Sequence, residues 1–353
     1  MTSNLKSSTN TGREQIFFSY GIRLISFFAV VLFHFNMAIV QFHPDSMLLG
    51  KLSYLNQTVG DIAISLFIIT SGFSLEMSTR GQFELRKYFA KRIISIYPAF
   101  WVCYLLVGAF LFLTSGHLTG DNHHWKLLLS ITGLDGFFLY KMQNYYLVGE
   151  WYTGYMLLTY LLFPFLLIGM RFNMAMTAVS VLAIFAVLYF NYNKFFDVYI
   201  NCNPLMRLPD FMFGMIYSKY IYSNRKSFYT SGITGALILV CLVTMFQSLP
   251  SQVYMLIFGC CIYSVLAVIF DLFKNVTPLT KNTSHLAGLT FIAFLLHHQI
   301  IYFLFGKLDY SVMTDIEAWY FFFVICFLSL ALASLLKPII GRVEQAMKKV
   351  LLN

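Results

Sequence analysis

An arginine and a histidine interrupt the first long apolar run of the chain, at Arg23 and His34. Histidine is the usual general base near neutral pH, because its environment easily tunes its pKa. Arginine binds phosphate and carboxylate groups through a planar fork of N–H donors. Ionisable residues inside membrane spans usually face a bundle interior or a cavity. The pair therefore suggests a site; the alternative is a snorkelling arginine and a core histidine.

The spacing of these two residues places them on one face of a helix. Eleven residues advance an α-helix by about 1100°, within about 20° of three full turns, and by about 16 Å along the axis. A second apolar run also carries titratable groups, because His297 and His298 stand in "FLLHHQ". Histidine at membrane depth in two separate runs favours a shared site over two unrelated packing residues.

The elements that must position these residues are membrane helices. Of the 353 residues, 59% are hydrophobic and 11% are charged, whereas a soluble domain carries about 25% charged residues. The composition therefore predicts an all-α, polytopic membrane bundle. Ten apolar runs are long enough to span a bilayer. They are Ile16–Val40, Val59–Met77, Ile93–Thr114, Trp151–Met170, Ala175–Tyr192, Leu205–Tyr222, Phe228–Phe246, Ser251–Phe273, Leu286–Gly306 and Ala318–Leu336.

The distribution of basic residues predicts the orientation of these spans. With the N-terminus inside, seventeen Lys and Arg residues fall on the cytoplasmic side and five on the outer side. This asymmetry follows the positive-inside rule and predicts cytoplasmic termini. It also accounts for the formal charge of +9 without a nucleic-acid partner. We expect one membrane domain over residues 1–353, with a cytoplasmic tail at 1–15 and a basic amphipathic tail on the inner leaflet at 337–353.

Two groups of potential metal ligands have simpler explanations. The longest loop, about residues 115–150, contains His117, His123 and His124, but no carboxylate or cysteine cluster accompanies them. A solvated, partly amphipathic segment explains this loop better than a metal centre. Five of the six cysteines lie in apolar runs without metal-ligand spacing. We therefore expect no metal site.

Six motifs follow one another between residues 21 and 299. They are Arg23 and His34 after Gly21, "SLFIITSGF" (Ser65–Phe73), "YFAKRIISIYP" (Tyr88–Pro98), "WYTGYMLLTYLLFP" (Trp151–Pro164), "RLPDFMFG" (Arg207–Gly214) and "GLTFIAFLLHHQ" (Gly288–Gln299). This ordered set resembles the membrane-bound acyltransferase type 3 family, the bacterial enzymes that O-acylate surface glycans. His297 stands at that family's second histidine position.

The chain departs from the family pattern at two places. The family's Arg-x-x-Arg pair at the inner edge of the third span is represented by Arg92 and Ser95, with Lys91 as a substitute cation. The Glu pair that often follows the family's tryptophan is replaced by Met156 and Leu157. These changes indicate a divergent subgroup whose acceptor recognition differs.

The resemblance implies an O-acyltransferase of the bacterial inner membrane. It implies acyl-CoA, most often acetyl-CoA, as a cytoplasmic co-substrate, no tightly bound cofactor, and a polysaccharide or lipid-linked glycan as acceptor. The expected donor-binding cations are Arg23, Arg86, Lys91 and Arg92, and the expected acceptor-side residues are Asp61, Glu150, Trp151 and Arg207. The catalytic residues would be Arg23, His34 and His297.

The residues give this reaction a physical form. An extended pantetheine arm could cover the roughly 16 Å between Arg23 and His34, so that His34 deprotonates the acceptor hydroxyl. Asp61 or Glu150 could orient the imidazole, and a covalent acyl-His34 intermediate is an alternative route. Two other functions stay open. One is a transporter or flippase of a glycan intermediate, disfavoured by the absence of repeat symmetry, and the other is a non-catalytic partner of a polysaccharide synthase.

Overall fold

The computed structural model describes residues 17–42, 48–118, 123–146, 148–246, 248–308 and 312–352. Most of these residues are helical, as the sequence predicts. The elements are α2 (Phe17–Phe42), β1 (Ser53–Tyr54), β2 (Gln57–Thr58), α3 (Val59–Ser78), α4 (Leu85–Ser115), η1 (His124–Lys126), α5 (Leu127–Thr132), η2 (Phe137–Tyr140), α6 (Glu150–Phe195), η3 (Ile200–Cys202), α7 (Leu208–Ile216), η4 (Tyr217–Tyr222), α8 (Arg225–Met245), α9 (Ser251–Leu272), α10 (Thr277–Ala287), α11 (Thr290–Phe305) and α12 (Asp315–Leu351).

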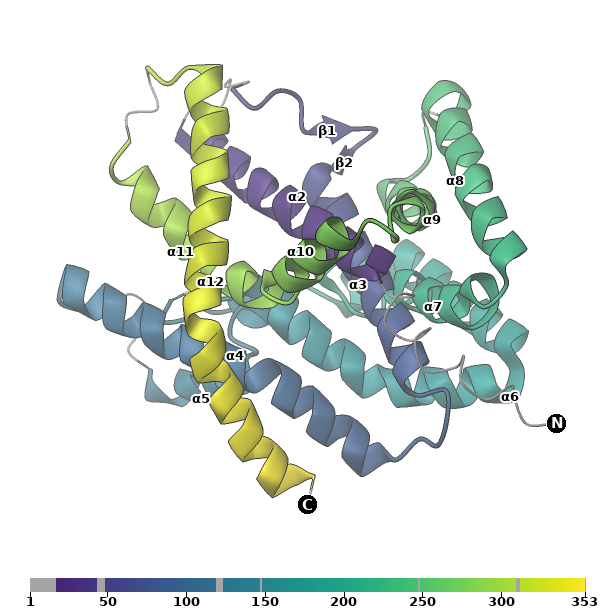
Figure 1. The fold of residues 1–353 in the computed structure, drawn as a ribbon, viewed down its shortest axis with the longest axis horizontal. Helices are drawn as coiled ribbons and strands as arrows, with labels where there is room; N and C mark the ends of the chain where they lie inside the picture. The colour runs from purple at the N-terminus through teal and green to yellow at the C-terminus, as the bar shows by residue number, and fades with distance from the viewer. Residues whose placement is uncertain are drawn as a thin grey trace.

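Helix α2 runs through the centre of the bundle, drawn in purple in Figure 1. It packs against α3, α9, α10, α11 and α12. The apolar side chains Phe27, Val31 and Phe35 follow one another at i, i+4 and i+8 and are fully buried, as expected for the core-facing stripe of a helix. The helix that carries Arg23 and His34 is therefore held from several sides.

The start of α3 is fixed by a capping box. Thr58 Oγ1 accepts a hydrogen bond from Asp61 N at 3.1 Å, and Asp61 Oδ2 accepts one from Thr58 N at 3.0 Å. This exchange satisfies two backbone donors at the helix end. Thr58 also ends the short hairpin β1–β2, in which it pairs with Ser53. The hairpin and the cap together fix the position of the Asp61 carboxylate.

Two motif glycines allow α3 and α7 to touch backbone to backbone. A Cβ on Gly72 would lie 2.0 Å from the carbonyl oxygen of Phe211, and one on Gly214 would lie 2.0 Å from that of Ile69. No side chain fits at such distances, so the crossing requires glycine at both positions. This contact explains the glycine of "SLFIITSGF" and the last residue of "RLPDFMFG", and it places Arg207 against α3.

The number of membrane spans is not confirmed as ten. Within the described residues, seven helices are long and apolar enough to cross a membrane, or eight if α10 and α11, which are bent by 59°, form one span. The sixth predicted span is represented by α7 and the π-helical segment η4, which begin only at Leu208 and are short for a bilayer. The fourth and fifth predicted spans lie in the single element α6.

Helix α6 is nevertheless broken where the two predicted spans meet. Asn173 has non-helical dihedral angles, with φ −155° and ψ 106°. A Cβ on Gly169 would lie 2.8 Å from Thr177 Oγ1, although residues eight apart in a straight helix are separated by about 12 Å. The chain therefore turns back sharply at Asn173.

The C-terminal segment is continuous with the last predicted span. The sequence predicts that the tenth span ends at Leu336 and that 337–353 forms a basic amphipathic tail, whereas α12 continues through Pro338 to Leu351 as one helix of 37 residues. Figure 1 shows it in yellow along the height of the molecule. The predicted N-terminal tail, residues 1–15, lies outside the described residues.

Many large apolar side chains on the outer helices are exposed, including Leu105, Phe172, Phe190, Ile316 and Phe327. A soluble protein rarely exposes so much apolar surface, whereas a membrane helix presents it to lipid. Together with the seven long apolar helices, this surface identifies the chain as a membrane protein.

Candidate active site

Arg23 and His34 each line a cavity, and the two cavities are neighbours. Arg23 lies near the first end of α2 and His34 about 16 Å farther along the same helix. Both side chains are partly buried. We call the spaces beside them the Arg23 cavity and the His34 cavity. The sequence predicts one passage along this face of α2, whereas the structure has two separate spaces.

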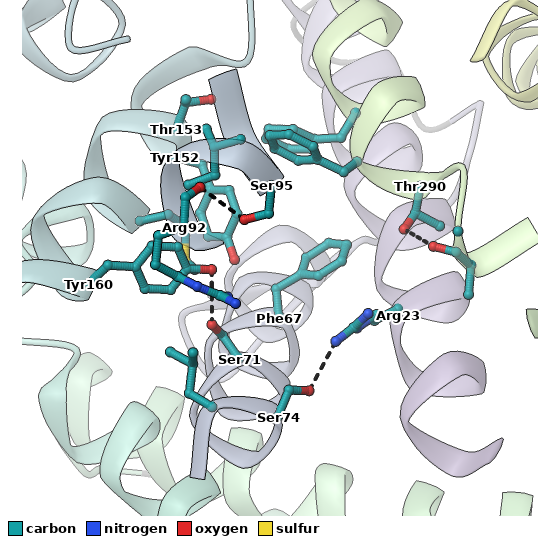
Figure 2. Close-up of a pocket in the computed structure, with 17 residues that line it drawn as sticks. Arg23, Phe67, Ser71, Ser74, Arg92, Ser95, Tyr152, Thr153, Tyr160 and Thr290 are labelled. Atoms are coloured by element: carbon teal, nitrogen blue, oxygen red, sulfur yellow. Dashed lines mark hydrogen bonds between the residues drawn. The ribbon is translucent and has the colours of Figure 1, made fainter. Parts of the chain in front are cut away.

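The Arg23 cavity has a volume of about 330 Å³. Its walls come from α2, α3, α4, α6 and the bend between α10 and α11. They are formed by Arg23, Phe67, Ser71, Ser74, Leu75, Arg92, Ser95, Ile96, Tyr152, Thr153, Met156, Tyr160, Ala287, Gly288, Thr290, Phe291 and Phe294. Figure 2 shows Arg23 and Arg92 entering the cavity from opposite sides, with Phe67 between them.

The two arginines of this cavity have few polar partners. Arg23 Nη2 donates to Ser74 Oγ at 3.0 Å. The guanidinium of Arg92 lies over the rings of Tyr88 and Tyr160, with its carbon 6.0 and 5.5 Å from their centroids. Arg92 Nε is buried and has no hydrogen-bond partner among the described residues. The cavity therefore holds two cations with donor capacity left for an anionic ligand.

The other expected donor-binding cations lie elsewhere. Lys91 is exposed and borders a separate pocket with Glu344 and Lys348 near the end of α12. Arg86 is exposed and does not line the Arg23 cavity. Lys91 does not line the Arg23 cavity, although its pocket shares Ser95 with that cavity.

Ser95, which replaces the second arginine of the family motif, does line the cavity. It therefore leaves a neutral group where a second cation would stand. Lys337 of α12 lies near this region, because its Nζ is 3.2 Å from the Cβ position of Gly288, another lining residue. No local pattern groups Lys337 with Arg92, since 245 positions separate them.

The His34 cavity is smaller, about 140 Å³. Its lining residues are Val30, Phe33, His34, Thr58, Gly60, Asp61, Ile64, Trp151, Tyr152, Tyr199, Asn201, Cys202, Arg207 and Phe294. The sequence-predicted residues His34, Asp61, Trp151 and Arg207 thus border one space. The side chain of Glu150, also predicted here, lies outside the described part of the structure.

Asp61 is held by partners other than His34. Its Oδ2 accepts from Thr58 Oγ1 at 2.7 Å, and its Oδ1 accepts from Asn201 Nδ2 at 3.1 Å. These contacts tie the carboxylate to the cap of α3 and to η3. A carboxylate has about four lone-pair sites, so these bonds leave room for a donor from His34, and the orienting role of Asp61 stays a prediction.

Arg207 is buried, and its positive charge is compensated by a neighbouring carboxylate. Its Nε lies 3.2 Å from Asp210 Oδ2, and its Nη2 donates to Ser65 Oγ at 2.6 Å. Its Nη1 contacts the sulfur of Met255. The counter-ion leaves Arg207 with little net charge toward the His34 cavity, and the hydrogen bond to Ser65 ties the start of α7 to α3. The acceptor-side role of Arg207 stays a prediction.

Two aromatic rings separate the cavities. Tyr152 and Phe294 line both spaces, and their ring centroids lie 5.4 Å apart in an edge-to-face arrangement. Tyr152 also stacks on Tyr155 at 5.7 Å. From the sequence, Trp151, Tyr152 and Tyr155 are expected at the outer mouth, where they could stack on a sugar ring. Phe294 is not grouped with them, because it stands 142 positions after Tyr152 and no local pattern links the two.

Both histidines of α11 approach His34. The ring of His297 lies 5.3 Å from that of His34, and the ring of His298 lies closer, at 4.2 Å. From the sequence, we expect a role for His297 alone and no metal site. In the structure, the ligand nitrogens of all three histidines lie within 4.8 Å of one another. The loop histidines His117, His123 and His124 belong to no such group among the described residues.

The segment between α4 and α6 supports the wall of the Arg23 cavity. Leu157 and Thr153 lie 3.4 and 3.6 Å from the Cβ position of Gly133. The neighbouring Asp135 accepts hydrogen bonds from Gly136 N at 2.8 Å and Ser130 Oγ at 3.2 Å. Burial raises the pKa of Asp135 to about 6, against the lowering effect of these bonds.

Comparison with known proteins identifies the family of the chain. A family model described as an acyltransferase domain, acyltransferase 3, matches residues 19–337. The acyltransferase MdmB of Streptomyces mycarofaciens is 33% identical over 86 residues, which are 24% of this chain and 22% of that protein. The match thus spans less than a quarter of the curated relative. No solved structure matches this chain significantly.

The family match includes every residue that lines the two cavities, from Arg23 to Phe294. It confirms the resemblance inferred from the six motifs of the sequence. The chain belongs to the acyltransferase 3 family of membrane acyltransferases.

Proposed function

We propose that this protein is an inner-membrane O-acyltransferase. It moves an acyl group from acyl-CoA to a hydroxyl of a surface or exopolysaccharide sugar, and we propose acetyl as the acyl group. The Arg23 cavity takes the donor from the cytoplasm, and the His34 cavity takes the acceptor from the outer side. Both termini are cytoplasmic in this orientation, in accord with the positive-inside distribution of Lys and Arg.

One observation carries the proposal: an arginine-lined and a histidine-lined cavity adjoin at the Tyr152–Phe294 ring pair. A group-transfer enzyme that takes its substrates from opposite sides needs two spaces that meet at the reacting atoms. A transporter requires a route that the whole cargo can follow. Two cavities with different charge, separated by two side chains, support the transferase.

The Arg23 cavity suits the anionic donor. Arg23 and Arg92 offer N–H groups to phosphate oxygens, for which the guanidinium fork is well matched. Ser71, Ser95 and Thr290 add hydroxyl groups along the walls. In this arrangement the pantetheine arm extends from the arginines toward Tyr152 and Phe294, and the thioester lies at the ring pair.

The reaction at the ring pair is an acyl transfer. His34 accepts the proton of the acceptor hydroxyl while that oxygen attacks the thioester carbonyl carbon. The tetrahedral intermediate collapses, the C–S bond breaks, and the CoA thiolate leaves with the proton returned by His34. A C–O ester bond replaces the C–S bond, and no other reactant is consumed. Base catalysis of this kind contributes about 10²–10⁴ in rate.

The His34 cavity suits an uncharged sugar. The indole of Trp151 lines it, and aromatic faces stack well on apolar ring surfaces. The ionised groups on its walls, Asp61 and Arg207, already have protein partners. A neutral, hydroxyl-rich acceptor therefore meets hydrogen-bonding groups without a strong net charge.

The test uses acyl-labelled acyl-CoA with membranes that contain the wild-type protein or the variant His34→Ala. The wild type is expected to transfer label to glycan, and His34→Ala to lose about 10²–10⁴ of that rate. His285→Ala, an exposed histidine of α10 outside both cavities, is the matched control. A His34→Ala variant that is normally inserted and transfers label at the wild-type rate would contradict the role of His34. Unconsumed acyl-CoA with wild-type protein would favour a transporter.

A further inference from the structure

Three histidines from two helices converge at one point of the bundle. His34 belongs to α2, and His297 and His298 belong to α11, which packs against it. Their ring centroids are 4.2 Å apart for His34–His298, 4.4 Å for His297–His298 and 5.3 Å for His34–His297. One ligand nitrogen of each ring lies within 4.8 Å of the other two.

This geometry is close to that of a three-histidine metal centre. Zn²⁺ binds imidazole nitrogen at about 2.0–2.1 Å and is tetrahedral, so two bound nitrogens stand about 3.4 Å apart. Any two ligand nitrogens of the cluster are therefore at most about 1.4 Å farther apart than two nitrogens bound to one Zn²⁺. Small rotations of the side chains close that difference. Imidazole ligands suit Zn²⁺, Cu²⁺, Ni²⁺ and Co²⁺, whereas Mg²⁺ and Ca²⁺ prefer oxygen.

The protein already orients one ring as a metal ligand requires. His297 Nδ1 lies 2.5 Å from the carbonyl oxygen of Phe294. A carbonyl oxygen only accepts hydrogen bonds, so Nδ1 carries the proton and the lone pair of the neutral ring is on Nε2. Histidines that bind metals usually donate their second ring N–H in this way.

The cluster also has a route of entry. His34 lines the His34 cavity, whereas His297 and His298 are buried and do not line it. An ion that enters the cavity therefore meets His34 first and then the two rings of α11. Three protein ligands leave a fourth tetrahedral position for water.

We propose that His34, His297 and His298 bind a transition-metal ion, Zn²⁺ or a cation of similar preference, and that the bound ion stops acyl transfer. The ion occupies the lone pair of His34 that accepts the hydroxyl proton, so a loaded protein has no base. Binding itself is independent of the proposed function, whereas the inhibition rests on it.

The binding test is a titration with Co²⁺, whose visible d–d absorption reports its ligands. Full-length protein in detergent, purified with a tag that contains no histidine and stripped with a chelator, is expected to bind one Co²⁺ per chain saturably. Zn²⁺ should displace it. The variants His298→Asn and His297→Asn are each expected to weaken Co²⁺ binding by more than about tenfold, because even outer contacts of a metal site are worth that much.

The matched controls keep the cluster and remove other histidines. His285→Asn and the triple variant with Asn at positions 117, 123 and 124 should leave the titration unchanged. A wild type without a saturable signal, or an unchanged signal in His298→Asn, would overturn the site. If neither cluster variant folds, X-ray absorption of Zn²⁺-loaded wild type decides. Three nitrogen ligands near 2.0 Å support the site, and a shell of oxygen alone refutes it.

Inhibition is measured separately, by acyl transfer with and without Zn²⁺. The metal-free protein is expected to be active, to lose activity as Zn²⁺ saturates the site, and to recover with a chelator. Undiminished transfer at saturating Zn²⁺ would overturn the inhibition. Co²⁺ binding in a protein that transfers no acyl group under any condition would refute the proposed function and leave the metal site standing.

Discussion

The two cavities beside α2 differ in how their charged groups are compensated. In the Arg23 cavity, Arg23 donates to the neutral hydroxyl of Ser74, and Arg92 rests on aromatic rings. In the His34 cavity, Arg207 pairs with Asp210, and Asp61 accepts hydrogen bonds from Thr58 and Asn201. The first space therefore has positive charge without a facing carboxylate among its lining residues, and the second is close to neutral.

This difference in compensation distinguishes charged residues that bind a ligand from charged residues that hold helices together. Arg23 and Arg92 are only partly buried, so they stay charged without a counter-ion and keep N–H donors for a ligand that supplies the negative charge. A buried cation with a counter-ion is already satisfied and holds elements together. Arginine thus has two roles in this bundle, and mutation can test each role separately.

The largest expected effect is on the supporting side, at the Arg207–Asp210 pair. Arg207→Met leaves Asp210 as a buried charge without its counter-ion, which costs about 3–5 kcal/mol. Most of the variant should fail to fold or should unfold at a much lower temperature in detergent. Thermal unfolding followed by intrinsic fluorescence measures this loss.

The double variant with Met at position 207 and Leu at position 210 is the control. Replacing both partners of a buried pair by apolar groups is often neutral or stabilising, so the double variant should recover most of the lost stability. A stable Arg207→Met protein that shows only a raised KM for the acceptor would assign Arg207 to binding and remove the contrast between the cavities.

The contrast was only partly predictable from the sequence. Arg23 and His34 lie on one helix, and helical periodicity is local, so their shared face could be predicted. The basic residues near α4 could be counted but not assigned to a face, and the structure brings Arg92 to the cavity while Lys91 and Arg86 lie outside it.

The remaining features depend on how distant helices pack. The division into two cavities depends on Tyr152 and Phe294, from α6 and α11, and no local pattern links them. His298 is missed for a related reason. From the sequence, His297 is chosen because it stands at the family's histidine position, and no local pattern shows that α11 approaches α2 so that both rings reach His34.

A smaller effect is expected on the binding side, at Arg92 and Arg23. A hydrogen bond to a charged group is worth about 1.5–3 kcal/mol, so Arg92→Gln or Arg23→Gln should raise the KM for acyl-CoA by about 10- to 100-fold. The KM for the acceptor and the folding yield should change little. Initial rates over a range of acyl-CoA concentrations measure the effect.

Two comparisons sharpen this result. Arg92→Lys keeps the charge but loses the planar fork, so it should recover only part of the affinity for acyl-CoA. Arg86→Gln removes the same charge from outside the cavity and should change the KM by less than about fivefold, the worth of an exposed ion pair. Equal effects of Arg86→Gln and Arg92→Gln would indicate a diffuse basic surface instead of a donor cavity.

The smallest effect concerns the hydroxyl of Tyr152, at the boundary between the two spaces. If the ring separates the cavities, Tyr152→Phe keeps the partition and loses at most one neutral hydrogen bond, about 1 kcal/mol or a fivefold change in rate. Tyr152→Ala removes the ring and opens the Arg23 cavity to water from the His34 cavity. Acyl-CoA should then be hydrolysed without acceptor, because water exclusion protects reactive groups in closed sites. Release of free CoA, measured with and without glycan, distinguishes the two variants. Identical behaviour of Tyr152→Phe and Tyr152→Ala would show that the ring divides nothing and that the cavities act as one.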